Sequence, residues 1–461
     1  MFAISYKGIF SIILIQSSSS FMKATSGSPS APKYPPAIRI SSIIYFLISI
    51  GVALQISGSN WDIVWHGIGN VETFFTPPHS VIYSGVALAI GSVVVGGIIH
   101  TTKISQQKNI SSKKNIFGLL IVSLPLSIKL AAIGCILQLT AGPFDFWWHN
   151  QFGFDGLLSP PHSVLATGML MAALGALIGI YYHYRNQNNN STSSSIFSKL
   201  SLIVAFAVFL LVGVGIVLMF TLPFSKGQYF DFNPNPLAAV VAASTFIPFI
   251  IGLCLFVAAK ISAFPTNNKR IPFMLTSIIA VIMIIQSTTT ITSNSYFAWL
   301  FPLYLLNILP AVVADILILS YLQKKKYEVM IPSSSSSSSS SYSSQSFSSN
   351  SEVANTNTKN NTTTIKLCLI ASMIVSIFYT TLFFPWTVDV YGGYFKPPNT
   401  LRTEQFFIQL LIPVILPIAV PVSILSSMAG GLVGRKLMNT RKVNSIIEPL
   451  TKEFASNQGR L

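Results

Sequence analysis

The sequence predicts an all-α fold, a polytopic membrane helical bundle of about ten spans with a duplicated helical hairpin among the first four. Three observations support this prediction. The 461-residue chain is 51% hydrophobic and only 9% charged, whereas about a quarter of a soluble protein is charged. Its apolar stretches reach the roughly 20 residues that a membrane-spanning helix needs. Two segments near the N-terminus also align with each other. This composition excludes ordinary soluble enzymes, disordered proteins and nucleic-acid binders.

The predicted spans are the long apolar stretches, in chain order 38–57, 79–100, 116–140, 163–183, 200–223, 237–261, 271–291, 296–322, 365–385 and 405–434. They divide the chain into an N-terminal segment (1–37), the four spans of the duplicated hairpins (38–183), four further spans (184–331), a linker (332–364), two final spans (365–434) and a basic tail (435–461). The linker is rich in Ser and Asn and too polar to fold by itself. Whether residues 1–21 belong to the mature protein stays open.

Charge predicts the orientation of these spans. The formal net charge is +16, and nearly all of the 28 Lys and Arg residues fall on the side that also holds both termini; the exceptions are Lys129, Lys226, Lys396 and Arg402. Basic residues accumulate in cytoplasmic loops of membrane proteins. We therefore expect a multi-pass protein of a prokaryotic cell membrane with both termini in the cytoplasm, and no nucleic-acid partner.

An internal repeat relates WDIVWHGIGNVETFFTPPHSVIYSG (61–85) to FDFWWHNQFGFDGLLSPPHSVLATG (144–168), which align without a gap at a separation of 83 residues. All six histidines obey this separation, in the pairs His66 and His149, His79 and His162, and His100 and His183. Two copies that run in the same direction are expected to pack about an axis along the membrane normal. The last pair lies at cytoplasmic helix ends, where we expect only an interaction with the helix dipole.

Each copy carries a candidate metal triad. Asp62 and His66 are four residues apart, so they share one face of a helix. Thr76 is a suitable N-cap and Pro77 a suitable first helical residue, which would place His79 at the outer end of the next helix. Two imidazoles and a carboxylate bind Zn, Cu or non-haem Fe and leave positions open for water or substrate.

The second copy repeats this pattern with Asp145, His149 and His162, and Ser159 stands in the cap position. Other residues are expected around the two triads. Acidic groups are suited to accept the remaining ring N–H of a ligand histidine, and tryptophans would form an interfacial belt or a dry wall. The candidates are Glu72 and Asp155 for the first role, and Trp65 and Trp148 for the second.

Two charged residues lie within predicted spans, Lys129 in the third and Asp315 in the eighth. Charges inside a membrane are expensive and are usually paired. A Lys129–Asp315 ion pair is therefore a hypothesis, either as a structural clamp or as part of a transport or proton pathway.

The D-x3-H-x12-H pattern before a membrane helix resembles the copper site in the C subunit of the membrane copper monooxygenases, the ammonia and particulate methane monooxygenase family. The stretch 72–79 (ETFFTPPH) is similar to that family's acidic-Thr, Phe-Thr-Pro and His segment. The resemblance implies copper ligation by Asp62, His66 and His79. It also implies a second site nearby, where the second triad falls. The chain likewise resembles uncharacterised multi-pass membrane proteins with WDxxWH…PPH.

This resemblance covers residues 55–185 and has departures. Asp145 stands where the family's second site has an amide, Asn70-Val71 stands where the family has an Arg, and the serine linker and ten spans are foreign to it. The sequence thus predicts a membrane metalloprotein, with copper as the expected metal and zinc or non-haem iron as alternatives. It would be a catalytic or non-catalytic monooxygenase-like subunit. Alternatives are a transporter or channel built on parallel repeats, and an assembly subunit. Expected partners are the bilayer, other membrane subunits or further copies of the chain.

Overall fold

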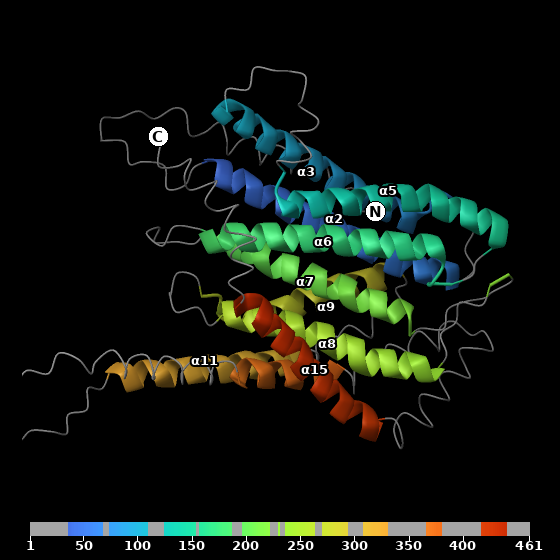
Figure 1. Ribbon diagram of the computed structural model, residues 1–461. Helices are drawn as coiled ribbons and strands as arrows, with labels where there is room; N and C mark the ends of the chain where they lie inside the picture. Colours follow the sequence, from blue (N-terminus) through green and yellow to red (C-terminus); the bar gives the residue numbers. More distant parts are fainter. Residues whose placement is uncertain are drawn as a thin grey trace, which may run out of the picture. The chain divides into compact units, whose positions relative to one another are not determined.

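The computed structural model describes residues 36–67, 73–108, 124–153, 156–186, 196–221, 229–230, 236–262, 270–293, 308–330, 366–379 and 416–439. These residues form ten helices and no strand, which confirms the all-α fold (Figure 1). The chain divides into Met1–Arg39, which holds only the start of the first described helix, and Ile40–Leu461. All packing described below lies within the second of these units.

Seven helices are long and apolar enough to cross a membrane, so the chain is a multi-pass membrane-spanning protein. They are α2 (Pro36–Gly67), α3 (Pro77–Lys108), α5 (Leu126–Phe152), α6 (Pro160–Asn186), α7 (Ile196–Met219), α8 (Pro236–Ser262) and α15 (Leu416–Asn439). Three further helices contain shorter apolar stretches: α9 (Met274–Ser293), α11 (Ile308–Met330) and Lys366–Phe378. Each of the ten predicted spans therefore overlaps a helix.

Several predicted boundaries are wrong. The third span was expected at 116–140, but α5 begins at Leu126, directly after Pro125, and ends at Phe152. The first was expected to end at residue 57, whereas α2 continues to Gly67. Apolar windows miss these ends because the last turns of both helices carry polar side chains. The helices thus extend through the Asp and His residues of the predicted triads.

Glycines bring α2 against α3, and α5 against α6. A Cβ atom at Gly51 would lie 2.7 Å from the carbonyl oxygen of Gly85, and one at Gly134 would lie 2.5 Å from that of Gly168. Only residues without a side chain allow two helix backbones to approach so closely, as in many membrane helix pairs. The two hairpins are therefore tightly closed below the loops that join their helices.

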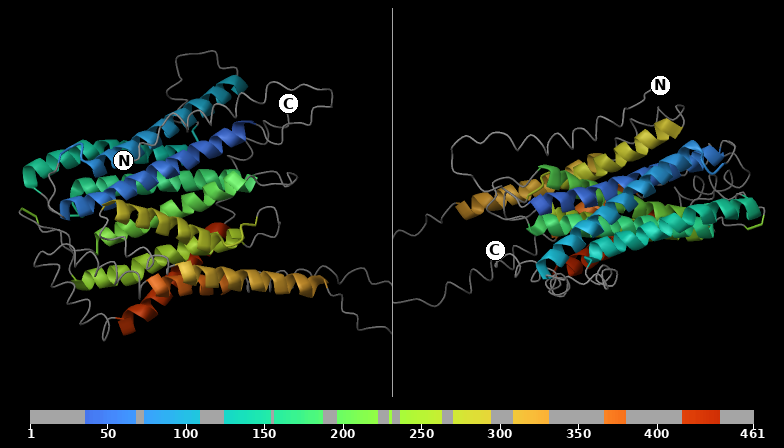
Figure 2. Two further views of the ribbon diagram at one scale, coloured as in Figure 1. Left: turned by 180° about the vertical axis from the view of Figure 1, so that it is seen from behind. Right: turned by 90° about the horizontal axis from the view of Figure 1, so that it is seen from above.

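Helix α7 is predominantly apolar and packs against α6, α8 and α9, whereas α11 packs against α9 and α15 against α8 (Figure 2). A helix that is hydrophobic all round belongs in the interior of a bundle. Helix α8 packs closely against α15, where a Cβ atom at Gly430 or Gly252 would clash with the facing backbone. This part of the protein buries most of the large side chains of the core.

Asp315 has hydrogen-bond partners that the sequence did not predict. Its carboxylate accepts hydrogen bonds from the backbone N–H groups of Leu275 (3.4 Å) and Thr276 (2.8 Å), and from the Thr276 hydroxyl (2.8 Å). It thereby caps the N-terminus of α9 from the neighbouring helix α11. A carboxylate is favourable at this end of a helix because unpaired N–H groups and the helix dipole both favour negative charge.

Some predictions lie outside the described residues. These are the linker 332–364, nearly all of the N-terminal segment 1–37 and of the tail after residue 439, and the side chains of Glu72 and Asp155. The membrane orientation and the prokaryotic location stay predictions.

Candidate metal centre

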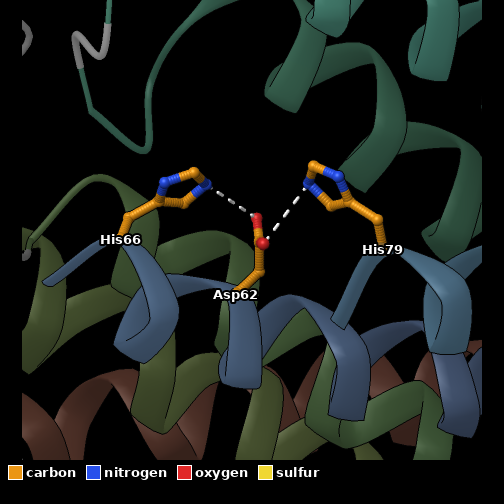
Figure 3. Close-up of side chains that lie close together, drawn as sticks. All are labelled: Asp62, His66 and His79. Atoms are coloured by element: carbon orange, nitrogen blue, oxygen red, sulfur yellow. Dashed lines mark ion pairs between the residues drawn. The ribbon is translucent and has the colours of Figure 1, made fainter. Parts of the chain in front are cut away.

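The first triad joins the end of α2 to the start of α3. Nε2 of His66 lies 3.4 Å from Oδ2 of Asp62, and Nε2 of His79 lies 3.3 Å from Oδ1 of the same carboxylate. Figure 3 shows this carboxylate between the two imidazoles, with each ring nitrogen directed at one oxygen. The four-residue spacing of Asp62 and His66 and the short connection to α3 create this arrangement.

The second triad joins α5 to α6 in the same way. Oδ1 of Asp145 lies 3.4 Å from Nε2 of His149 and 3.2 Å from Nε2 of His162. In each triad, ligand atoms of the three residues lie within 4.8 Å of one another. The structure thus brings all six predicted ligands together in two groups of three.

The start of the second helix positions the third ligand in each triad. The backbone N–H of His79 donates to the Thr76 hydroxyl at 3.4 Å, and the Ser80 N–H donates to the Thr76 carbonyl at 2.9 Å. At the second triad the Ser163 N–H donates to the Ser159 carbonyl at 3.0 Å, but the buried Ser159 hydroxyl has no hydrogen-bond partner among the described residues. The Thr76 side chain therefore acts as the predicted cap, and the Ser159 side chain does not.

Three of the histidine rings are held by backbone carbonyl groups. Nδ1 of His79 lies 3.2 Å from the oxygen of Thr73, and Nδ1 of His162 lies 3.0 Å from that of Gly156. Nδ1 of His149 lies 3.1 Å from the oxygen of Gly153. A carbonyl oxygen only accepts, so each Nδ1 must carry the proton. In the neutral ring, Nε2 then presents a lone pair to the aspartate.

This arrangement leaves two acceptors facing each other. Oδ1 of Asp145 faces both His149 and His162. This oxygen is buried and accepts no hydrogen bond from the described residues. Oδ1 of Asp62 is likewise buried and accepts no hydrogen bond from them. A carboxylate and an imidazole lone pair repel each other unless a proton or a cation lies between them. Buried carboxylates are rarely left in this state. The donor set therefore fits a bound cation.

The two triads are neighbours. The ring centroids of His66 and His149 are 6.1 Å apart, a separation similar to the 6.4 Å between His66 and His79 and the 5.6 Å between His149 and His162. Sequence analysis left open whether the triads were separate. The structure places them next to each other as a cluster of four imidazoles and two carboxylates.

Aromatic rings surround the cluster. Tyr83, one turn after His79, has its ring centroid 5.9 Å from that of His79 and 5.0 Å from that of Phe74. Phe74 also contacts Phe146, which follows Asp145 in α5. Sequence analysis missed Tyr83, although its position four residues after a predicted ligand is a usable signal. Four residues after His162, the matching position beside the second triad is Ala166.

The two predicted tryptophans, Trp65 and Trp148, differ in their surroundings. Trp148 contacts Phe152 (4.6 Å between ring centroids) and Phe230 (5.8 Å), and Trp65 is half-buried. Away from the cluster, His183 packs against Tyr45 and Tyr182, as expected of a structural histidine.

Comparison of the sequence with protein-family models and with curated proteins, and of the structure with solved structures, found no match.

Proposed function

We propose that this protein is a membrane metalloprotein whose two Asp/His/His triads each bind a transition-metal ion, with copper as the expected metal. The observation that supports this most directly is the pairing of a buried carboxylate with imidazole nitrogens whose partner nitrogens already donate to carbonyl groups. In their neutral form such rings have no proton to offer the carboxylate, because their one N–H already donates to a carbonyl group. A metal ion between them would bind both.

The distances agree with this proposal. Metal bonds to nitrogen and oxygen are about 2.0–2.2 Å long, which separates tetrahedral ligands by about 3.3–3.5 Å. The His–Asp separations are 3.2–3.4 Å. Three protein ligands leave at least one position open, which is typical of catalytic rather than structural sites. The carbonyl groups that hold Nδ1 would fix the ring orientation, a known role of groups behind metal ligands.

The choice of copper rests on the resemblance to the copper monooxygenase C subunit, because imidazole ligands also suit zinc and iron. Bound copper would supply redox chemistry. The chain's own residues would hold the ion, orient the rings and keep bulk water away with the aromatic side chains around Phe74 and Tyr83. A small apolar substrate could reach such a site from the bilayer.

A duplication is part of the proposal. The separation of 83 residues that relates the two triads also relates Gly51 to Gly134 and Gly85 to Gly168, the residues at close contacts between α2 and α3 and between α5 and α6. One ancestral hairpin with one triad would account for both sets of positions.

Metal analysis of the detergent-purified full-length protein tests the function. We expect about two equivalents of copper, about one in each single variant, His66→Ala and His149→Ala, and about none in the double variant. His183→Ala is the matched control, because it removes a histidine that packs against tyrosines outside the cluster, and should keep full metal content. A wild-type protein that binds no transition metal after exposure to copper, zinc and iron salts would refute the proposal.

Transport is the second candidate function. It is favoured by polar side chains buried within the spans, such as Gln55 and Gln138. Reconstitution into liposomes separates the two functions, because a transporter would carry metal ions or protons across the bilayer. A metalloprotein of the first kind would hold them in fixed proportion without flux.

A further inference from the structure

Two glutamines are buried inside membrane-spanning helices with no protein partner for their amides. Gln55 in α2 is 0% exposed and Gln138 in α5 is 2% exposed. Neither the oxygen nor the nitrogen of either amide has a hydrogen-bond partner among the described residues. An amide offers two donors and an acceptor, and its burial without partners costs several kcal/mol in an apolar environment.

Other buried polar groups in the same helices do find partners. The Tyr45 hydroxyl lies 2.6 Å from that of Ser127, and the Ser49 hydroxyl donates to the Tyr45 carbonyl at 3.1 Å. Single polar atoms are also unpartnered at positions such as Gln286 and Ser287, but only Gln55 and Gln138 among the described residues leave both the oxygen and the nitrogen of a buried amide without a partner. A leucine or methionine would fill a similar volume without a polar group to satisfy, so packing alone does not explain a glutamine at both positions.

The position of the two side chains is the same in both hairpins. Cγ of Gln55 lies 2.9 Å from where a Cβ atom of Gly85 would be, and Cγ of Gln138 lies 2.8 Å from the corresponding place at Gly168. Each stem thus passes over a glycine at which the two helices of its hairpin are in close contact. A glycine at this position leaves space for the glutamine side chain, and any larger residue would occupy that space.

Each glutamine also lies on the same helix face as its triad. Gln55 precedes Asp62 by seven residues, and Gln138 precedes Asp145 by seven, which is two helical turns or about 10 Å. Both glutamines lie within candidate membrane spans, Ser42–His66 and Leu126–Phe152. Bulk water does not reach this depth, and lipid chains offer no hydrogen bonds.

We propose that Gln55 and Gln138 each bind a buried water molecule, so that a hydrated polar site lies two turns below each triad within the membrane-spanning part of the protein. The ligand must both donate and accept hydrogen bonds and must be small, because the side chains are fully enclosed. Water meets both requirements, and buried waters typically satisfy polar groups that the protein leaves unpaired. These waters would extend the polar face of each helix from the triad toward the centre of the bilayer. This inference does not depend on metal binding.

A high-resolution structure of the full-length protein by electron cryo-microscopy, in lipid nanodiscs, tests the proposal directly. We expect a density peak within hydrogen-bond distance of each amide, and its loss in Gln55→Met and Gln138→Met at the substituted site only. Clear side-chain density with no such peak, or amides that contact only protein atoms, would overturn the proposal.

Thermal unfolding gives a second, independent measurement. Methionine has a similar shape without the amide. If the amides bind water, each Gln→Met variant loses hydrogen bonds, and its unfolding midpoint should fall about 2 °C or more below that of the control. The matched control is Ile48→Met, which replaces another fully buried residue of α2 at a position seven residues earlier. A midpoint of either Gln→Met variant above that of the wild-type protein would mean that the amide is unsatisfied, and would overturn the proposal.

Discussion

The close contact between α2 and α3 predicts that Gly51→Ala destabilises the protein and weakens its first metal site. The Cβ atom of the new alanine would lie 2.7 Å from the Gly85 oxygen and 3.0 Å from the Ala89 nitrogen. An unstrained carbon–oxygen contact is about 3.3 Å or longer. The two helices must therefore separate by roughly 0.6 Å, because both neighbouring atoms belong to the backbone and cannot rotate away.

The expected magnitude follows from two opposing terms. Overpacking of this kind costs about 1–3 kcal/mol. Replacing glycine by alanine within a helix contributes about 1 kcal/mol in the opposite direction. Gly91→Ala isolates the second term, because Gly91 lies in α3 with nothing within 4 Å of its Cβ position. We therefore expect Gly51→Ala to be about 1–3 kcal/mol less stable than Gly91→Ala, a difference of roughly 1–3 °C in unfolding midpoint for a chain of this length.

The same displacement should reach the metal site. His79 on α3 lies 3.3 Å from Asp62 on α2, so a shift between these helices changes the distance between two ligands directly. Titration of copper into the purified variants measures this effect, and Gly51→Ala should bind less tightly than Gly91→Ala at its first site. Equal midpoints for the two variants would refute the reasoning, since they would show that the glycine contact does not limit the approach of the helices.

Further predictions concern the ligands and the cap of α9. Asp62→Asn and Asp145→Asn should each weaken metal binding at one site by more than about 100-fold. Even residues that only hydrogen-bond to a metal ligand change the affinity about 10–100-fold. Undiminished binding of two metal equivalents would contradict the assignment of these aspartates as ligands. Lowering the pH from about 7.5 to about 5 should release the metal, because a protonated imidazole cannot bind a metal ion. Equilibrium dialysis at each pH measures the bound metal. Retention of the metal at the lower pH would mean that the histidines are not ligands. Asp315→Ala removes three hydrogen bonds to the start of α9 and should lower the free energy of unfolding by about 1–2 kcal/mol or more. Thr276→Val removes only the hydroxyl hydrogen bond and should lower it by about 1 kcal/mol. Equal unfolding midpoints for the two variants would exclude the capping role.

Much of the site could be predicted from local spacing. Asp62 and His66 lie on one face because a helix turns every 3.6 residues, and Pro77 marks where the next helix begins. Both statements need only the residues near them. The same reasoning located the second triad, since its residues repeat the pattern 83 positions later.

Predictions that required two distant segments to meet were less successful. A Lys129–Asp315 pair was the hypothesis for Asp315, because charges inside a membrane are usually paired, and hydrogen bonds from a neighbouring helix end were not foreseen. The structure instead directs its carboxylate to the first turn of α9, where backbone N–H groups are available. Hydropathy shows that a buried charge needs a partner, but it does not count backbone donors at a helix end.

The sequence by itself determined that the chain is helical and crosses a membrane, and which side chains can act together within a single hairpin. Composition and residue spacing suffice for these properties, because a helix satisfies its own backbone in the bilayer and repeats at a known period. Only the tertiary structure decided that His66 lies beside His149 and that backbone carbonyls hold Nδ1 of three imidazole rings. It also decided that the amides of Gln55 and Gln138 are enclosed with no partner among the described residues. These relations depend on how closely separate helices approach, which small residues at their contacts permit but local sequence does not specify.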